Sequence, residues 1–558
     1  MITFYPLDQQ KLFTNRDYEL TQLGHLVHTL ETGPAEHAAL FGLRRIGKTL
    51  LLKEFMRRLL QTKPSVHPVY MDFSTLASSP ENFALGYAGL ICHWILNRGE
   101  SDAGPFLSPA TLPGALMQAD GAWLYPFLEP LLRELEKARP DRQVLFRSAF
   151  HFPQQVTHAN QNQLVLVFDE FQEIRTLTRF PDSHNILALL RSEMQSQSGI
   201  LYILAGSAIS VLTSMLSDPE SPLFAQFSHL PIEPFDREAT GVLAGKLTTG
   251  QAGADLLPLI HNLTNGHPFY ITALCRRLMN LVEAAGRPME VNTVKQAFLL
   301  ETLAPYGRIY DFCRYIYDLS LQKASGYGVL KAVLQILSTE EGLTTSQVAR
   351  QLRVTPASAS DYLRWLREVD LITESDHRYY FCDPVLRFWV ANTIRGIELG
   401  LTAEPLDLAS LMTRLDAQFQ RASEELGVAQ ESAVRELMRR FDGQQIDGAI
   451  FNIPGSVVLP RFERVEPYIS QDGQVQLDAL GETSQREKWI VEVKWRNRRI
   501  GRKEVEKLSN RAREFNAQGW LISRSGFTED ALEQAENSRL FLSDRSGMRE
   551  LKQLIEQG

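Results

Sequence analysis

The stretch that most clearly carries chemistry is a glycine-rich loop with the spacing GxxxxGK[ST], running from Gly42 to Thr49. An apolar run of strand type precedes it, and leucines at helical spacing follow it. Glycines let backbone N–H groups turn toward phosphate oxygens at the positive end of a helix. We therefore predict that Gly42 and Gly47 shape a nucleotide loop, rather than a turn beside a solvated lysine. Lys48 would contact the β- and γ-phosphates of ATP, and Thr49 would bind Mg²⁺.

Two carboxylates follow a continuous apolar run, Leu164 to Phe168, which is typical of a buried parallel strand. Because ligands collect at the carboxyl ends of such strands, Asp169 and Glu170 would lie beside the phosphate loop. We predict that Asp169 holds Mg²⁺ through its water shell and that Glu170 polarises the water that attacks ATP. A later strand, Ile200 to Ala205, leads to Ser207, which either senses the γ-phosphate or caps the next helix.

A third set of chemical residues lies near the C-terminus. The strand-like run Val475 to Leu480 contains Asp478, and the run Trp489 to Trp495 contains Glu492 and Lys494. Strand alternation puts Glu492 and Lys494 on one face. If the two strands pair, Asp478 and Glu492 can bind one Mg²⁺ while Lys494 orients or activates the attacking water. The alternative is an ordinary salt bridge at the surface.

A basic run follows this third set in a chain whose net charge is −8. Its members are Lys494, Arg496, Arg498, Arg499, Arg502, Lys503, Lys507, Arg511 and Arg513. Because nucleic acid is bound largely through phosphate charge, a local cluster beside metal ligands predicts DNA binding over Lys494 to Arg513. The alternative is a solvated helix whose charges pair with Glu504 and Glu506.

The chain that must position these residues is too long for a single hydrophobic core. Its 558 residues suggest three or four domains. With 44% hydrophobic and 22% charged residues, the composition is that of an ordinary globular protein. The predicted fold class is multidomain α/β. We divide the chain into a P-loop ATPase core (residues 1–235), a helical segment (236–325), a winged helix-turn-helix (326–402), a helical connector (403–427) and a C-terminal α/β domain (428–558).

Within the first domain, we expect a helix from Leu12 to about Leu30, capped by Thr14 or Asn15. A second strand should run from Val66 to Phe73, and residues 96–163 should be mostly helical. A further helix is expected from about Ile186 to Gln197. Together with the strands named above, these elements predict a parallel sheet covered by helices.

A winged helix is predicted in the middle of the chain. One helix ends at Leu352, a second ends near Val369, and the strands Leu371–Thr373 and Tyr379–Phe381 would pair as a small wing. The second helix carries both signs of charge, on Arg364, Arg367, Asp361, Glu368 and the adjoining Asp370. DNA contact by this domain and a purely structural role therefore stay open.

The cysteines and the apolar runs indicate the cellular compartment. The four cysteines are scattered without paired spacing, which favours buried thiols in a reducing cytosol over disulfides or a zinc site. No apolar run approaches the length of a membrane span, and the N-terminus lacks the basic start and apolar core of an export signal. We therefore expect a cytoplasmic protein with no membrane partner.

Several motifs taken together resemble the archaeal-type ATPases, which belong to the STAND branch of P-loop NTPases and are related to AAA+ proteins. The matching residues are Asn15-Arg16-Asp17, Arg44-Arg45, Asp169-Glu170 with Gln172, Gly206-Ser207 and Asn265-Gly266-His267-Pro268. The resemblance implies a RecA-like sheet followed by a helical lid. It also implies that Arg44 and Arg45 belong to the nucleotide loop. Gly266 and Pro268 would lie near the adenine.

One position departs from that family. Gln226 stands where the family often carries an arginine, so an arginine finger from this position is not implied. The last domain resembles a second group, the PD-(D/E)xK nuclease superfamily, through Asp478 and the ExK motif of Glu492 and Lys494. That resemblance implies that Glu431, in an expected amphipathic helix, is a further acidic ligand of the metal.

The function predicted from these observations is an ATP-binding and ATP-hydrolysing switch that regulates a C-terminal Mg²⁺-dependent DNA endonuclease. The architecture suggests a role in defence against foreign DNA. Two alternatives stay open: a catalytically silent, DNA-binding regulatory ATPase, and a signalling STAND ATPase that has protein partners only. A protein partner or a homo-oligomer is compatible with all three.

Overall fold

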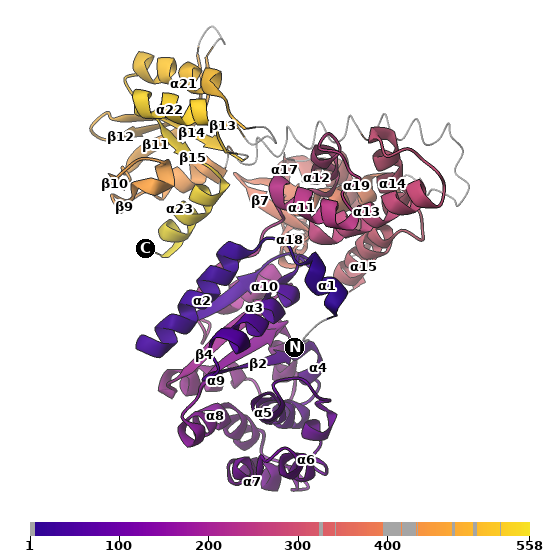
Figure 1. Cartoon of the computed structure of the whole chain (residues 1–558). Coiled ribbons are helices and arrows are strands. Elements are labelled where there is room, and N and C mark those ends of the chain that lie inside the picture. Colours follow the sequence, from indigo (N-terminus) through magenta and orange to yellow (C-terminus); the bar gives the residue numbers. More distant parts are fainter. Residues whose placement is uncertain are drawn as a thin grey trace. The chain divides into compact units, whose positions relative to one another are not determined.

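The computed structural model describes residues 6–322, 327–340, 342–393, 415, 431, 433–470, 475–494, 499–524 and 526–557. The chain divides into two compact units, Met1–Pro234 and Phe235–Gly558, and Figure 1 labels many of their elements. The predicted connector, residues 403–427, lies outside the described residues apart from Leu415. The finer division into five domains stays a prediction.

A five-stranded parallel sheet forms the centre of the first unit. Its strands lie in the order β2-β3-β4-β1-β5. Their bounds are β1 (His37–Phe41), β2 (Val66–Asp72), β3 (Gln163–Asp169), β4 (Ile200–Gly206) and β5 (Phe227–Pro231). Because β3 and β4 lie inside the sheet with both faces covered, nearly every one of their side chains is buried. This explains the continuous apolar run that ends at the two carboxylates.

Helices cover both faces of this sheet. One face packs on α2 (Asp17–Thr32) and α3 (Lys48–Thr62), and the other packs on a larger helical layer. The helices of the first unit other than α2 and α3 are α1 (Leu7–Leu12), α4 (Phe73–Leu76), α5 (Pro80–Asn97), η1 (Gly104–Leu107), α6 (Leu112–Gln118), η2 (Ala122–Leu124), α7 (Tyr125–Leu135), α8 (Arg142–Asn160), η3 (Phe171–Arg179), α9 (Ile186–Ser196) and α10 (Ile209–Ser217). The α/β fold with a parallel sheet, expected from the sequence, is confirmed.

The start of the first long helix was predicted wrongly. The structure has a short α1 and then begins α2 at Asp17, because Asn15 and Arg16 both adopt positive φ, at 59° and 78°. Neither Thr14 nor Asn15 caps α2. The Thr14 hydroxyl donates to the Leu12 carbonyl. The N-cap position is occupied by Arg16, whose side chain makes no capping hydrogen bond. A tertiary contact explains the break, since Arg16 donates to the Ile46 carbonyl in the phosphate loop at 3.2 Å.

The second unit begins with helices. These are α11 (Arg237–Leu247), α12 (Leu257–Thr264), α13 (Pro268–Glu283), α14 (Val291–Leu303) and α15 (Arg308–Gln322). The next elements are α16 (Tyr327–Thr339), β6 (Leu343–Thr344), α17 (Thr345–Leu352), α18 (Pro356–Glu368), β7 (Ile372–Ser375), β8 (Arg378–Phe381) and α19 (Pro384–Thr393). The strands β6, β8 and β7 form a small antiparallel sheet. Its assignment as a winged helix stays a prediction.

A mixed sheet forms the centre of the C-terminal region. Its order is β11-β12-β13-β14-β15, with antiparallel pairing from β11 to β13 and parallel pairing from β13 to β15. The elements are β9 (Gln445–Asp447), η4 (Gly448–Phe451), β10 (Ser456–Val458), β11 (Phe462–Ile469), β12 (Gln476–Thr483), β13 (Lys488–Lys494), α21 (Arg502–Glu514), β14 (Gln518–Ser523), α22 (Glu529–Ser538), β15 (Phe541–Ser543) and α23 (Arg545–Gln557). The predicted pairing of the two acid-bearing strands is therefore confirmed.

Two apolar clusters cover the faces of this mixed sheet. One contains Ile490 and Leu521 together with Val505 and Leu508 of α21, so α21 covers that face. Strand alternation puts Glu492 and Lys494 on the same face as Ile490, toward α21. Within the described part of the chain, no helix combines the length and the apolar character needed to cross a membrane.

Candidate functional sites

The phosphate loop connects β1 to α3 in the first unit. Gly47 has φ of 103°, a left-handed conformation that favours glycine. A Cβ on Gly42 would lie 2.7 Å from the Ile232 carbonyl oxygen, so only glycine fits there. The loop places Arg44 half-buried and Arg45 exposed, the latter with φ of 58°. The two predicted glycines are therefore required by the backbone itself.

Lys48 is buried, with 5% of its surface exposed. Its ammonium donates to the carbonyl oxygens of Gly42 at 2.7 Å and Leu43 at 3.0 Å. The ammonium of Lys48 is thereby held within the turn of the loop, and a loop of this type offers its backbone N–H groups to phosphate oxygens. This position suits a group that contacts phosphate oxygens.

Thr49 and Asp169 meet although 120 residues separate them in the chain. The Thr49 hydroxyl donates to Oδ2 of Asp169 at 2.5 Å, and the Tyr70 hydroxyl donates to the same oxygen at 2.8 Å. Burial raises the pKa of Asp169, while these two hydrogen bonds lower it. Hydroxyl and carboxylate oxygens are ligands that Mg²⁺ prefers, so the pair fits the predicted metal role. The sequence analysis did not identify Tyr70, whose only signal was its place two residues before the end of β2.

Glu170 is held in place by two neutral polar side chains. Its Oε2 accepts from the Ser207 hydroxyl at 2.7 Å and from Nε2 of Gln172 at 2.5 Å. The backbone supports this arrangement, because Glu170 adopts φ of 51° and turns the chain directly after β3. Ser207 does not cap α10, because the N-cap position of this helix is occupied by Ala208. The structure therefore assigns the Ser207 hydroxyl to Glu170, and the sequence analysis had not given Gln172 a contact.

The remaining residues of the nucleotide prediction lie further along the chain. Gly266 has φ of 70°, and its carbonyl accepts from the Phe235 backbone N–H at 2.8 Å. Pro268 occupies the first turn of α13. Both belong to the second unit, and their place near the adenine stays a prediction. Gln226 donates to the Phe224 carbonyl at 3.3 Å.

In the C-terminal region, the pairing of β12 with β13 brings the third set of residues together. Ala479 pairs with Val491 in the antiparallel register of the two strands. The next residue on each strand is an acid, Asp478 on β12 and Glu492 on β13. Oδ2 of Asp478 accepts from the Val493 backbone N–H at 2.6 Å. The Lys494 ammonium donates to Oε2 of Glu492 at 2.5 Å. This contact confirms that Glu492 and Lys494 share one face of β13.

Glu431 lies in the electrostatic field of the same acids. The pKa of Glu431 is raised to about 7, first because the side chain is partly buried and second because Asp478 is negative. Burial also raises the pKa of Asp478. A bound cation would relieve this crowding of negative charge, and carboxylate oxygens are its preferred ligands. The chemical type of these donors therefore suits a divalent metal.

These acids do not form a closed metal cage. Among the described residues, no group of three or more His, Cys, Asp or Glu side chains stands close enough to hold a metal ion. Two arginines contact the site instead. Arg435 donates to the Asp478 carbonyl oxygen at 2.7 Å, and Arg511 of α21 donates to Oε1 of Glu492. The sequence analysis missed Arg435 and placed Arg511 only in the basic run, although its spacing of three residues from the buried Leu508 was a signal.

The rest of the basic run is solvent-exposed where the structure describes it. Arg502, Lys503, Lys507 and Arg513 are exposed, whereas Arg496 and Arg498 lie outside the described residues. Arg502 pairs with Glu506 at 2.7 Å, as the alternative interpretation expected for part of the helix. The exposed members leave a positive surface on α21 that suits phosphate contact.

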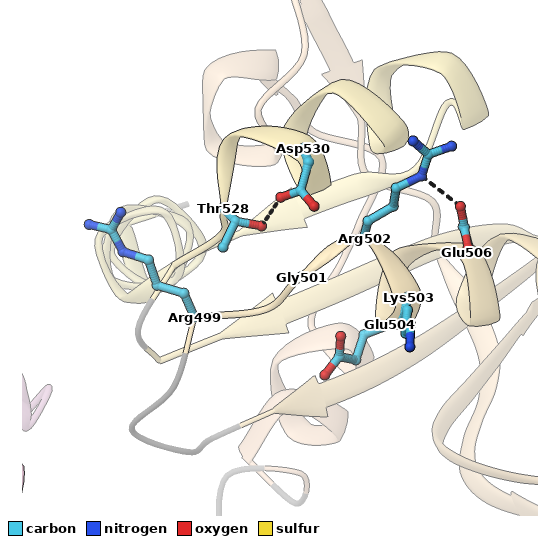
Figure 2. Close-up of a pocket in the computed structure, with 8 residues that line it drawn as sticks. All are labelled: Arg499, Gly501, Arg502, Lys503, Glu504, Glu506, Thr528 and Asp530. Atoms are coloured by element: carbon cyan, nitrogen blue, oxygen red, sulfur yellow. Dashed lines mark hydrogen bonds and ion pairs between the residues drawn. The ribbon is translucent and has the colours of Figure 1, made fainter.

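A hollow of about 680 Å³ opens beside the start of α21. Figure 2 shows its lining residues, which come from the segment before α21, from α21 itself and from the start of α22. They are Arg499, Gly501, Arg502, Lys503, Glu504, Glu506, Thr528 and Asp530. The lining contains three cations and three acids, so it has no net charge that would favour an anion. None of the acids of the β12–β13 site lines it.

Comparison with known proteins supports the nuclease interpretation. Residues 461–552 match the family model Mrr_cat, described as a restriction endonuclease. The matched range contains Asp478, Glu492, Lys494 and Arg511, whereas Glu431 precedes it. No curated protein sequence matches the chain.

Solved structures similar to this chain include one protein each from Pyrococcus, Aeropyrum and Thermotoga. The Walker-type ATPase of Pyrococcus abyssi is 16% identical with a TM-score of 0.48, covering 70% of this chain and 99% of that one. The ORC1 protein of Aeropyrum pernix in complex with DNA is 14% identical with a TM-score of 0.35, covering 69% and 95%. The RuvB Holliday junction branch migration motor of Thermotoga maritima is 15% identical with a TM-score of 0.34, covering 71% and 98%.

The chain thus joins an ATPase-like P-loop fold to a restriction endonuclease-like domain. The fold of the first unit rests on its parallel sheet, its phosphate loop and the contact between Thr49 and Asp169. The second assignment rests on the mixed sheet and the family match. Together these features support ATPase and nuclease activity.

Proposed function

We propose that the chain is an ATP-binding and ATP-hydrolysing switch that regulates a C-terminal, Mg²⁺-dependent DNA endonuclease. One observation carries the proposal. The pairing of β12 with β13 assembles Asp478, Glu492 and Lys494 inside the restriction endonuclease match, on a chain that also carries a complete phosphate loop. A nucleotide site and a nuclease site on one polypeptide are most simply explained if one controls the other.

At the nucleotide site, the chain's own residues divide the work. The loop between Gly42 and Thr49 would bind the phosphates through its backbone N–H groups and Lys48. Asp169 and Thr49 would hold Mg²⁺, which neutralises charge on the transferred phosphoryl group. Glu170 would orient and polarise the attacking water while Ser207 fixes the position of its carboxylate.

At the nuclease site, Asp478 and Glu492 supply carboxylate oxygens, with Glu431 as a third acid nearby. A bound Mg²⁺ would polarise the scissile phosphate. Lys494 would orient or activate the attacking water, since its ammonium already lies against Glu492. The exposed cations of α21 would bind the DNA backbone.

The decisive experiment incubates the purified full chain with plasmid and Mg²⁺, with and without ATP. Lys48→Ala and Asp478→Ala are tested beside it, and ATP turnover is measured in the same samples. We expect metal-dependent nicking or cleavage that Asp478→Ala abolishes while its ATP turnover persists. Lys48→Ala should lose ATP turnover and should no longer respond to ATP in the cleavage assay.

The other outcomes identify the alternatives. Plasmid that stays intact under all conditions, despite measurable DNA binding, would favour a silent DNA-binding regulatory ATPase. No DNA binding at all would favour a signalling ATPase with protein partners or a homo-oligomer. The mixed charges of α18, where Arg364 pairs with Asp361 at 2.5 Å, favour this second alternative over DNA contact by that helix.

A biological role follows from the proposed activity. An ATP-controlled nuclease of restriction type is suited to destroy foreign DNA inside the cytoplasm, so we propose a role in defence. Phage plating on cells that carry the wild-type gene or Asp478→Ala tests this role. Equal plating efficiency on the two strains would refute it.

A further inference from the structure

Arg511 differs from the other basic residues of α21. Only 13% of its side chain is exposed, whereas Arg502 on the same helix exposes 59% of its side chain. Its Nη1 donates both to Oε1 of Glu492 and to the Gln476 backbone carbonyl, the latter at 3.0 Å. The guanidinium is therefore anchored between β12 and β13 at the acids of the nuclease site.

Glu492 consequently has a cation on each carboxylate oxygen. Arg511 occupies Oε1, and Lys494 occupies Oε2 at 2.5 Å. One oxygen of Asp478 is also engaged, by the Val493 backbone N–H. In keeping with this arrangement, the described part of the chain contains no ready-made cluster of three metal-binding side chains. The positive charge that a metal would supply to Glu492 is already supplied by the protein.

We propose that Arg511 is a positioning residue that holds Glu492 in a cation-paired state, and that the phosphate backbone of bound DNA draws Arg511 away so that DNA and divalent metal bind cooperatively. The inference rests on the proposed nuclease function and specifies how its metal site is regulated. Arg511 contacts neither metal nor substrate in the paired state, so its role there is exerted through Glu492.

The position of Arg511 on α21 supplies the route for this exchange. Lys507 lies one helical turn before Arg511 and is exposed, so DNA phosphates held by Lys507 would approach the Arg511 side chain. A guanidinium binds phosphate in a bidentate manner as readily as it binds carboxylate. Once Arg511 turns to a phosphate, Oε1 of Glu492 becomes available to the metal.

Thermodynamic linkage makes the proposal measurable. If DNA removes a competitor of the metal, DNA must tighten metal binding, and metal must tighten DNA binding by the same factor. Removing the guanidinium should therefore tighten metal binding in the absence of DNA. A residue that merely orients Glu492 for the metal would behave in the opposite way, because its loss would weaken metal binding.

The test uses the nucleotide-free full chain and Mn²⁺ as the probe. Free Mn²⁺ is followed by electron paramagnetic resonance, and the titration of Asp478→Asn is subtracted to isolate the nuclease site. Wild type, Arg511→Gln and Arg511→Lys are compared with Arg461→Gln. Arg461 is exposed and lies at the end of the sheet away from Asp478, so its variant removes one equal charge outside the site. Each titration is repeated with a short phosphorothioate duplex that resists cleavage.

We expect Arg511→Gln to bind Mn²⁺ about tenfold more tightly than wild type without DNA, the size of one charge-assisted hydrogen bond. DNA should tighten Mn²⁺ binding by wild type and by Arg461→Gln, and should have little effect on Arg511→Gln. Unchanged or weaker Mn²⁺ binding by Arg511→Gln would overturn the proposal. If that variant does not fold, wild type alone decides, because equal Mn²⁺ affinity with and without DNA also overturns it.

These outcomes separate the inference from the proposed function. A chain that binds Mn²⁺ and DNA cooperatively through Arg511 but leaves plasmid intact would refute the nuclease and keep the metal linkage. A chain that cleaves plasmid while Arg511→Gln binds Mn²⁺ like wild type would refute only the role of Arg511.

Discussion

The two acidic sites of this chain are held by different kinds of partner. In the first unit, neutral groups hold the acids: Asp169 accepts from Thr49 and Tyr70, and Glu170 accepts from Ser207 and Gln172. In the C-terminal region, cations hold the key acid, since Glu492 pairs with Lys494 and Arg511. Neutral donors fix a carboxylate without cancelling its charge, whereas cations cancel it.

This difference has a functional meaning. In our proposal, the nucleotide site offers its carboxylates to the Mg²⁺ that accompanies ATP without first exchanging a directly paired cation, because the hydrogen bonds described above for Asp169 and Glu170 come from neutral donors. In our proposal, the nuclease site has to exchange partners before it binds metal, because Glu492 is already paired with two cations. Such a site suits an activity that has to stay off until DNA and a signal are present. The four predictions below test this contrast.

The largest effect is expected from Lys494→Ala. Loss of the ammonium should lower the rate of plasmid cleavage by about a hundredfold to ten-thousandfold, the usual contribution of a positioned catalytic side chain. Metal binding should become tighter, because one cation leaves Glu492. Lys488→Ala is the matched control, since Lys488 stands at the other end of β13, 4.0 Å from Glu482. Weaker Mn²⁺ binding by Lys494→Ala would contradict the claim that the cations on Glu492 compete with the metal.

Glu170→Gln should lower ATP turnover by about a hundredfold or more, because an amide does not polarise the attacking water. The change is nearly isosteric, and Ser207 can still donate to the remaining carbonyl oxygen. ATP affinity should therefore stay close to that of wild type. Turnover is measured by phosphate release at saturating ATP, and an unchanged rate would remove Glu170 from catalysis.

Ser207→Ala should have a smaller effect on the same site. It removes one neutral hydrogen bond from Glu170, worth about 1 kcal/mol, so turnover should fall by about fivefold. ATP affinity should stay close to that of wild type when Ser207 acts through Glu170 alone, whereas weaker ATP binding would support the prediction that Ser207 senses the γ-phosphate. Ser214→Ala, at an exposed position on α10, is the control. A loss as large as that of Glu170→Gln would mean that Ser207 contacts the reacting atoms itself.

The smallest effect concerns pH and Glu431. Its pKa in the folded chain is raised from 4.5 to about 7, so between these values the folded state binds more protons than the unfolded state. Rising pH therefore removes stability through this group. The glutamine in Glu431→Gln cannot ionise. The melting temperature of this variant should therefore rise relative to that of wild type as pH rises from about 5 to about 7.5. Glu436→Gln, at an exposed position, is the control for the loss of one negative charge.

Much of the fold was readable from the sequence because the strands are strongly patterned. The runs that became β3, β4 and β13 were identified within a residue or two of their bounds. The strands β5 and β11 were not identified, because their side chains are only partly buried and their pairing depends on distant segments. The helix predicted to begin at Leu12 failed for a similar reason, since a contact from Arg16 to the phosphate loop interrupts it.

The sites show the same division. Lys48 could be placed in the loop from the spacing of its motif, and Asp169 at the edge of the sheet from the apolar run before it, while their roles with ATP and Mg²⁺ stay predictions. Tyr70 and Arg511 could not, because each acts through a contact that only the folded sheet creates, with Asp169 in one case and Glu492 in the other. The sequence showed Arg511 as one more cation, and only its burial against an acid separates it from the rest of α21.

The most direct test of the whole account is the rate of plasmid cleavage in Mg²⁺, measured for one preparation of the full chain with and without ATP. The account predicts that ATP changes this rate, and that Lys48→Ala makes the rate insensitive to ATP while Asp478→Ala abolishes cleavage. A wild-type chain that cleaves plasmid at the same rate in both conditions would contradict the central claim, because its two sites would then be independent.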